Sequence, residues 1–316
     1  METILKTKPF DSHSVGEKEM IVISDDVIKD VDLIQAFGKR HRGSMLFDAL
    51  LTQSVVDFVL ASVIQEQVLP REGNDRYKMM AYQESQNLFW VTQRHLSQHA
   101  LHDGDVCTVM TLDRLKRTHA LIMNKLDIAD SDKGCVCLRG RYSVYQGKKH
   151  VYPRFQNKKE AETILEEILM EYNEALKTIS RESDWNKSLK QSVYLASWIF
   201  FQITAIHPFA DGNGRTARIL ASRCFPQLFY LPVFLWGKLT PLSIECVDAI
   251  IQCRAKRKLF ALDRLVYSSL QKTLQNVKWR AEKLESALSK ILGAQLPQQL
   301  QHKDDVRMEK GGKKVD

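Results

Sequence analysis

The residues best suited to chemistry in this 316-residue chain lie in one short segment, 207–218, with the sequence HPFADGNGRTAR. His207 can serve as a general base, because a neutral imidazole accepts a proton near pH 7. Asp211, further along the same segment, can supply a carboxylate oxygen to a hydrated Mg²⁺. A base and a metal carboxylate this close together indicate a site where a substrate group is deprotonated beside a metal-bound anion.

The same segment carries groups that bind phosphates. Gly212 and Gly214 permit backbone conformations that other residues resist, so that peptide N–H groups can approach an anion closely. Arg215 begins a new stretch with helical periodicity, and the N-terminus of a helix attracts anions through its N–H groups and its dipole. Arg215 and Arg218 share one face of that helix, where both can bind phosphate oxygens. Each feature alone is a weak signal, but their order within one segment predicts a di- or triphosphate site.

A buried helix must position His207. Residues 193–206 are apolar at nearly every position, which is typical of a helix buried on all sides. The stretch is too short for a membrane span, which takes about 20 apolar residues. Asp184 or Asn186 is expected to cap its start. Pro208 ends it, because the residue before a proline is disfavoured in the α region, and His207 therefore lies at the end of a rigid core helix.

Segment 207–218 resembles the motif of the Fic family, His-Pro-Phe-x-Asp/Glu-Gly-Asn-Gly/Lys-Arg with a second arginine after two further residues. Every fixed position is matched, and a looser resemblance covers residues 55 to 225. The resemblance implies a mainly α-helical bundle with a small β-hairpin, the flap, beside the active-site loop. It also implies a protein adenylyltransferase, which transfers AMP from ATP, with Mg²⁺ as cofactor, to a Ser, Thr or Tyr hydroxyl of a target protein.

By the same resemblance, the motif histidine is the catalytic base and the remaining motif residues bind the nucleotide. Asn213 orients the loop and the α-phosphate, while Arg215 and Arg218 bind the β- and γ-phosphates. Asp211 holds the metal ion. Phe209 is expected to anchor the loop in the core rather than to contact the nucleotide.

The donor nucleotide is less well determined. Relatives that transfer phosphocholine or a whole phosphate tend to replace one of the motif glycines, so the presence of Gly212 and Gly214 favours nucleotidyl transfer. The stretch that corresponds to the base-reading region of relatives, 242–263, contains neither the tyrosine nor the asparagine that often flank adenine. ATP is the expected donor, with UTP, GTP and CDP-choline as alternatives. A catalytically idle Fic scaffold that binds a nucleotide or a partner is the alternative outside the enzymes, and the complete motif argues against it.

A β-hairpin is predicted over 136–153, where β-branched and aromatic residues alternate on both sides of a turn at Gly147. It resembles the Fic flap, and an exposed strand edge can bind an extended segment of a target protein. Two departures from the family stand out. Ser143 replaces an arginine that relatives often carry, and Tyr152-Pro153 replaces a Pro-Pro pair. An ordinary hairpin with no role in target binding is the alternative.

A second motif concerns regulation. Many Fic proteins are inhibited by a helix with the pattern Ser/Thr-x-x-x-Glu-Gly/Asn, whose glutamate pairs with the second motif arginine. Ser62 and Glu66 match this pattern, whereas Gln67 does not. Glu66 is the expected inhibitory carboxylate, which would compete with the γ-phosphate for Arg218, and Glu84 is the next candidate. In some relatives the same glutamate supports removal of AMP, so a reverse activity stays open, as does a solvated glutamate with no regulatory role.

Apolar residues at helical spacing predict a mainly helical chain. The expected helices are 28–38, 44–68, 75–100, 112–126, 161–172 and 258–290. The expected units are an N-terminal helical region with the inhibitory helix (1–105), a Fic core (106–235), C-terminal helices (236–292) and a flexible tail (293–316).

Composition bounds the partners and the compartment. The net charge is +8, and the basic runs at 39–42 and 254–258 are interpreted as solvated faces, because no zinc finger, RNP-like sequence or interleaved aromatic residues accompany them. Six scattered cysteines and the lack of an apolar segment near Met1 predict a reducing, cytoplasmic location, with a secreted effector also compatible. The expected partners are a nucleotide and a target protein, with no membrane. A homodimer stays open.

Overall fold

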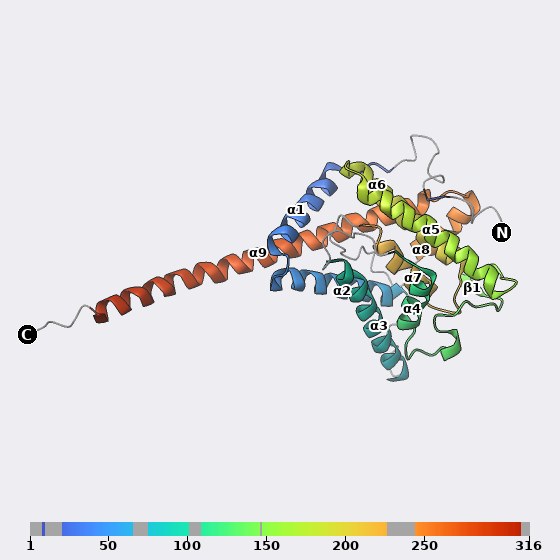
Figure 1. Ribbon diagram of the computed structural model, residues 1–316, viewed down its shortest axis with the longest axis horizontal. Coiled ribbons are helices and arrows are strands. Elements are labelled where there is room, and N and C mark those ends of the chain that lie inside the picture. The colour runs from blue at the N-terminus through green and yellow to red at the C-terminus, as the bar shows by residue number, and fades with distance from the viewer. Residues whose placement is uncertain are drawn as a thin grey trace, which may run out of the picture.

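The computed structural model describes residues 8–9, 21–65, 75–100, 109–145, 147–225 and 244–310. It confirms a mainly α-helical bundle with one small β-hairpin (Figure 1). The elements are α1 (Asp25–His41), α2 (Met45–Gln65), α3 (Asp75–Ala100), α4 (Leu112–Ile122), a 3₁₀ turn η3 (Asp130–Asp132), β1 (Tyr142–Tyr145), β2 (Lys148–Val151), α5 (Lys158–Arg181), α6 (Trp185–Ile206), α7 (Asn213–Ser222), α8 (Ile244–Lys256) and α9 (Phe260–Lys310).

Helix α6 is the central element, as the nearly continuous apolar run at 193–206 predicts. The side chain of Asp184 caps its N-terminus by accepting a hydrogen bond from the Lys187 N–H at 3.2 Å. Nearly the whole second half of α6 is buried, including Trp198 and Ile199. The helix packs against α5, α7 and α9. Because it is enclosed on several sides, it gives His207 at its C-terminal end a rigid support.

A second, smaller apolar cluster joins the N-terminal helices to the helix that follows the motif. Its buried members come from α2, α3, α4 and α7, for example Val55, Leu88, Ile122 and Ile219. Each of these side chains lies on a helix face that repeats every three to four residues, and burying these faces together aligns the four helices. The cluster therefore fixes α3 beside α4 and α7, which carries the motif arginines.

Within the described residues, one helical stretch is long and apolar enough to cross a membrane by length and composition, 45–63 in α2, with a mean hydropathy of 1.6. Half of that stretch is buried inside the protein. Phe58 and Val59 from this stretch lie in the cluster shared with α3 and α4. A core helix of a globular protein meets the same criterion, so the finding is weak evidence for a membrane span.

Helix α9 packs its first half against α1, α2, α6 and α8 and then extends far beyond the other helices (Figure 1). The helix continues through Lys310, and the flexible tail that the sequence predicts from residue 293 on stays a prediction. Residues 311–316 lie outside the described part of the chain.

The predicted hairpin is confirmed for its two main strands. β1 and β2 pair antiparallel, with Tyr142 opposite Val151. The prediction of strand structure at 136–138 is wrong, since that stretch is irregular. Its backbone instead contacts the motif, because the Cys137 N–H donates to the Pro208 carbonyl at 2.8 Å. The hairpin is therefore connected directly to the loop that follows α6.

Candidate active site

His207 marks the point where the chain leaves α6. Its backbone lies in the left-handed region (φ 52°, ψ 58°), and its N–H donates to the Ile203 carbonyl at 2.9 Å. This conformation is unfavourable for a residue with a side chain and tends to occur at functional sites. The Arg141 guanidinium donates to the carbonyls of His207 and Pro153. The peptide of His207 is thus held both by its own helix and by the segments that flank the hairpin.

The imidazole of His207 lies between aromatic and charged groups. The ring of Tyr152 stacks on it with centroids 3.8 Å apart and planes inclined by 10°. Burial makes the largest contribution to lowering the pKa of His207 from 6.5 to about 4; the positive charges of Arg141 and Arg254 act in the same direction, and Asp211 acts in the opposite direction. The imidazole is therefore neutral at pH 7, which is the state that a general base requires.

The loop between α6 and α7 is closed by side-chain hydrogen bonds. Asn213 Oδ1 accepts from the Phe209 N–H, and Asn213 Nδ2 donates to the Phe209 carbonyl, both at 2.9 Å. The Phe209 ring is fully buried and stacks on His119 of α4 at 3.8 Å. Asn213 therefore orients the loop and Phe209 anchors it, in the positions that the sequence predicts for them.

His119 is a further support of the site that no local sequence pattern indicates. Its Nδ1 accepts from the Gly134 N–H at 2.9 Å, so its Nε2 carries the proton and donates to the Asp211 carbonyl at 2.8 Å. Burial lowers the pKa of His119 from 6.5 to about 4, which keeps the ring neutral and this tautomer in place. The Asp211 peptide is thus held by α4 as well as by its own loop.

Helix α7 begins at Gly212, whose φ of 72° is in the left-handed region. A Cβ atom at this position would lie 2.6 Å from Met123 Sδ of the segment after α4, so the position requires glycine on two grounds. The Gly212 carbonyl accepts from the Thr216 N–H at 3.0 Å, which starts the helix. The first N–H groups of a helix have no partner within the helix, so this N-terminus is suited to an anion.

The two motif arginines lie on α7 and are buried, each about 4% exposed. Arg215 Nη1 lies 2.7 Å from Glu84 Oε1 of α3, and Arg215 Nη2 lies 3.1 Å from Asp211 Oδ1. Glu84 is as deeply buried as Arg215, whereas the Asp211 side chain is 63% exposed. An arginine that is expected to bind a phosphate therefore makes two carboxylate contacts in this structure.

The structure describes two of the three residues expected to regulate the site. Ser62 is buried on α2, and Glu66 lies outside the described residues, so its role stays a prediction. Glu84, the next candidate, contacts the first motif arginine, Arg215. Among the described residues, Glu84 is therefore the carboxylate whose place in the structure fits an inhibitory contact.

Three other residues of the site are placed there by the tertiary structure. The sequence assigns Arg254 to a solvated face, but its guanidinium lies over the Tyr152 ring, 5.4 Å from the centroid, and donates to the Thr204 carbonyl at 3.3 Å. Arg141, which holds the His207 carbonyl, had no motif to identify it. The one signal for Tyr152 was its departure from the Pro-Pro pair of the Fic flap. None of these positions has a local pattern, because packing alone brings them to His207.

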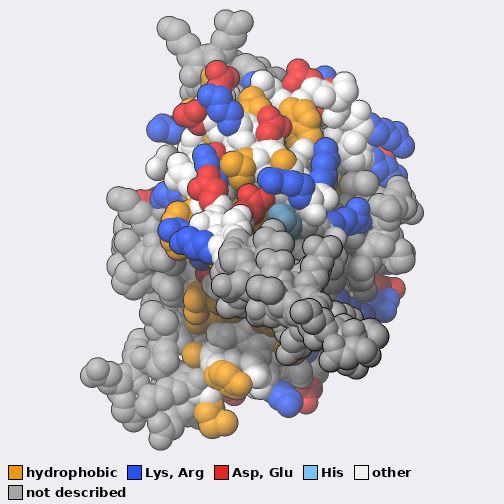
Figure 2. All heavy atoms as spheres, turned by 90° about the vertical axis from the view of Figure 1, so that its left-hand side faces the viewer, with side chains coloured by type: hydrophobic (Ala, Val, Ile, Leu, Met, Phe, Trp, Pro, Cys, Tyr) orange, Lys and Arg blue, Asp and Glu red, His pale blue; other side chains and the backbone are white. Residues whose placement is uncertain are grey.

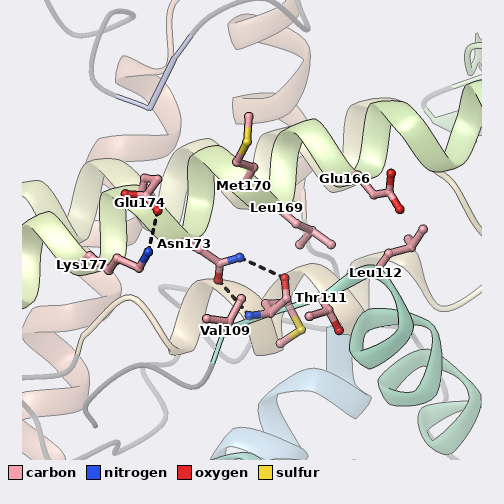
Figure 3. Close-up of a pocket in the computed structure, with 10 residues that line it drawn as sticks. Val109, Thr111, Leu112, Glu166, Leu169, Met170, Asn173, Glu174 and Lys177 are labelled. Carbon is pink, nitrogen blue, oxygen red and sulfur yellow. Dashed lines mark hydrogen bonds and ion pairs between the residues drawn. The ribbon is translucent and has the colours of Figure 1, made fainter.

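A pocket of about 340 Å³ lies away from the motif, between the start of α4 and α5 (Figure 3). Within it, Asn173 Oδ1 accepts from the Met110 N–H at 2.9 Å, and Asn173 Nδ2 donates to the Met110 carbonyl at 3.0 Å. The Thr111 side chain caps α4. These bonds attach the start of α4 to α5, so they contribute to the placement of His119.

Together, the site contains a neutral histidine at the end of a buried helix, a helix N-terminus that begins with glycine, and two buried arginines, an arrangement suited to phosphate binding. Residues 109–224 match the model of the Fic/DOC family. This segment contains α4 to α7, the hairpin and the whole motif, so this part of the chain matches a Fic domain of the Fic/DOC family. Members of this family are commonly transferases.

Solved structures share the fold. A Fic domain containing signaling protein from Bacteroides thetaiotaomicron VPI-5482 is similar with a TM-score of 0.57 and 15% identity over 80% of this chain and 97% of that one. Fic-1 (residues 134–508) from C. elegans is similar with a TM-score of 0.50 and 16% identity over 83% of this chain and 72% of that one. Both identities are low, so these likenesses concern the fold alone.

A curated protein also matches part of the sequence. The ribonucleoside-diphosphate reductase small chain of Ostreid herpesvirus 1 (isolate France) is 28% identical over 134 residues, which make up 42% of this chain. The chain spans 22% of the length of that protein. A match of this extent carries no activity over to this chain.

Proposed function

We propose that this chain is a protein adenylyltransferase, which transfers AMP from ATP to a Ser, Thr or Tyr hydroxyl of a target protein. The observation that carries the proposal is the neutral imidazole of His207 at the end of α6, beside the anion-binding N-terminus of α7. Asn213 and His119 hold the loop between them in one conformation. These contacts support a site in which the proposed base and the proposed phosphate-binding groups are organised before a nucleotide binds.

The proposed reaction uses these groups in one displacement. His207 accepts the proton of the target hydroxyl as its oxygen forms a bond to the α-phosphorus of ATP. The bond from the α-phosphorus to the bridging oxygen breaks, and pyrophosphate leaves with the electron pair. The amides around Gly212 and Gly214 stabilise charge on the α-phosphate, and Arg215 and Arg218 bind the β- and γ-phosphates.

Asp211 fits a Mg²⁺ ion of the kind that this reaction needs. Its side chain is 63% exposed and lies at the start of the phosphate-binding helix. No cluster of three or more His, Cys, Asp or Glu side chains suited to a metal occurs among the residues that the structure describes. Mg²⁺ matches a single carboxylate, because it keeps several waters and takes its other ligands from phosphates. Bound there, the ion would neutralise charge on the leaving pyrophosphate.

The hairpin is proposed to bind the target. β1 and β2 form a sheet of two strands, so each has an outer edge that can pair with an extended segment of another protein. Tyr142, Val144 and Val151 are exposed on one face of the hairpin and offer apolar contacts to side chains of that segment. The contact of Cys137 with Pro208 would bring the bound segment close to His207.

A protein target is favoured over a nucleic acid by the distribution of charge. On the face shown in Figure 2, Lys and Arg side chains alternate with Asp and Glu side chains. A surface that binds a nucleic acid backbone gathers positive charge on one face or along one stripe. On the coloured part of this face, side chains of both signs are therefore mixed.

Intact-mass measurement of the purified protein tests the proposal. The protein is incubated with Mg²⁺ and with ATP, UTP, GTP or CDP-choline in turn, and self-modification is read as the mass added. ATP is expected to add one AMP group, and His207→Ala is expected to abolish the addition while the fold is kept. His41→Gln, which alters a histidine remote from the motif on α1, is the matched control. Undiminished labelling of the His207→Ala protein would refute the role of the imidazole, and labelling by another donor alone would replace ATP.

A further inference from the structure

His207 forms one layer of a stack of three side chains that come from three separate elements. The Tyr152 ring, directly after β2, lies parallel to the imidazole with centroids 3.8 Å apart. The Arg254 guanidinium of α8 lies 5.4 Å from the centroid of the Tyr152 ring. We propose that Tyr152 and Arg254 are positioning residues that hold the His207 ring in its reactive orientation. This inference rests on the proposed function, in which His207 is the base.

Tyr152, the middle layer of the stack, is held through its backbone and through its hydroxyl group. The Tyr152 N–H donates to the Arg141 carbonyl at 3.0 Å, and the Tyr152 hydroxyl donates to Ser143 Oγ at 3.0 Å. A ring fixed through its backbone and its hydroxyl has little freedom to rotate. Because its plane is inclined by only 10° to the imidazole, it covers one face of His207 and leaves the edge of the ring for a substrate.

Arg254, the outer layer of the stack, connects it to helix α6. Arg254 donates to the Thr204 carbonyl at 3.3 Å, in the last turn of α6 before His207. A second contact joins α8 to the hairpin, since the Tyr145 hydroxyl donates to Asp248 Oδ1 at 3.1 Å. Helix α8 therefore holds the hairpin and the end of α6 in one arrangement. Movement of α8 would change the orientation of the histidine ring.

The charges around the ring favour its neutral form. The positive groups are Arg141, before β1, and Arg254, on α8, while Asp211 in the motif loop is the negative group. Burial makes the largest contribution to the lowered pKa of His207, and the two arginines add to it. The stack thus has two effects on a general base, because it restricts the ring and brings one of these positive charges next to it.

Two variants separate these effects, and histidine NMR reads both without depending on catalysis. The His207 ring signal among the nine histidines is assigned by its loss in His207→Asn. In Tyr152→Leu, this signal is expected to lose the shift caused by the stacked ring. In Arg254→Gln, the pKa of His207 is expected to rise by about half a unit to one unit. Tyr142→Leu and Lys256→Gln are the matched controls, as they remove an exposed hairpin tyrosine and an exposed charge on α8, and both are expected to leave the ring shift and the pKa unchanged.

Rates of self-modification provide the second measurement. Tyr152→Leu is expected to lower kcat about tenfold with little change in the KM for the nucleotide, because only the orientation of the base is altered. Tyr152→Phe keeps the stacked ring and is expected to retain most of the rate. Circular dichroism checks that each variant is folded. An unchanged His207 signal and pKa in folded Tyr152→Leu and Arg254→Gln would overturn the inference. If the NMR changes occur as expected but no donor labels the native protein, the proposed function would be rejected and the stack would be kept.

Discussion

Replacement of Glu84 by glutamine tests whether α3 restrains the nucleotide site. In the structure, Glu84 Oε1 lies 2.7 Å from Arg215 Nη1, and both side chains are about 95% buried. Arg215 is also proposed to bind a phosphate of the donor. The carboxylate and the phosphate therefore compete for one guanidinium, and a nucleotide must displace Glu84 or bind without that arginine.

The size of the effect follows from the burial of this pair. Removal of one partner of a buried ion pair destabilises a protein by about 3–5 kcal/mol, because it leaves the other charge uncompensated. The loss here is expected at about 2–4 kcal/mol, since Asp211 Oδ1 remains 3.1 Å from Arg215. A nucleotide phosphate replaces the missing negative charge in Glu84→Gln without having to displace a carboxylate. We expect the Kd for ATP to fall about tenfold to a hundredfold, which corresponds to about 1.4–2.8 kcal/mol.

Calorimetric titration and thermal unfolding measure both parts of this prediction. The Glu84→Gln protein is expected to unfold at a lower temperature than the native protein without nucleotide, to gain more stability from ATP, and to modify itself faster. Asp57→Asn is the matched control, because Asp57 pairs with Arg280 of α9 away from the motif. That variant is expected to lose stability without a change in nucleotide affinity. Weaker or unchanged ATP binding by Glu84→Gln would show that the pair only stabilises the fold.

Two further predictions concern the motif loop and its histidines. Gly212→Ala is expected to destabilise the protein by about 1–3 kcal/mol in thermal unfolding, because φ is 72° and a Cβ atom would lie 2.6 Å from Met123 Sδ. Gly147→Ala is the control, since Gly147 has the same φ but open space around it. This variant is expected to destabilise the protein less. The folded-state pKa values of His119 and His207 are lowered to about 4, so the unfolded chain takes up protons below pH 6.5 that the folded protein excludes. The free energy of unfolding therefore has its full value above pH 6.5 and decreases as the pH falls toward 4. The decrease is about 2 kcal/mol per histidine between pH 6.5 and 5. Urea unfolding at several pH values measures this loss, and a His119→Gln protein with an undiminished pH slope would contradict the contribution of that ring.

The proposed catalytic residues could be predicted from the sequence because they are contiguous. The proline determines where the long apolar helix ends, and the glycine determines where the next helix begins. Residues His207 to Arg218 therefore specify their own local structure. The same holds for the two strands of the hairpin, whose alternating pattern and turn glycine are local. Asn213 and Phe209, four residues apart, also contact each other within the loop.

The contacts that hold and restrain the site required the tertiary structure. Glu84 is separated from Arg215 by more than a hundred residues, and Arg254 from Tyr152 by about as many. Such pairs form only when apolar faces of helices pack in one particular register, as in the cluster of α2, α3, α4 and α7. The sequence therefore determined which chemistry the motif can perform. Packing decided which carboxylate meets its arginine and which ring lies on its base, because those partners are selected by distance in space rather than along the chain.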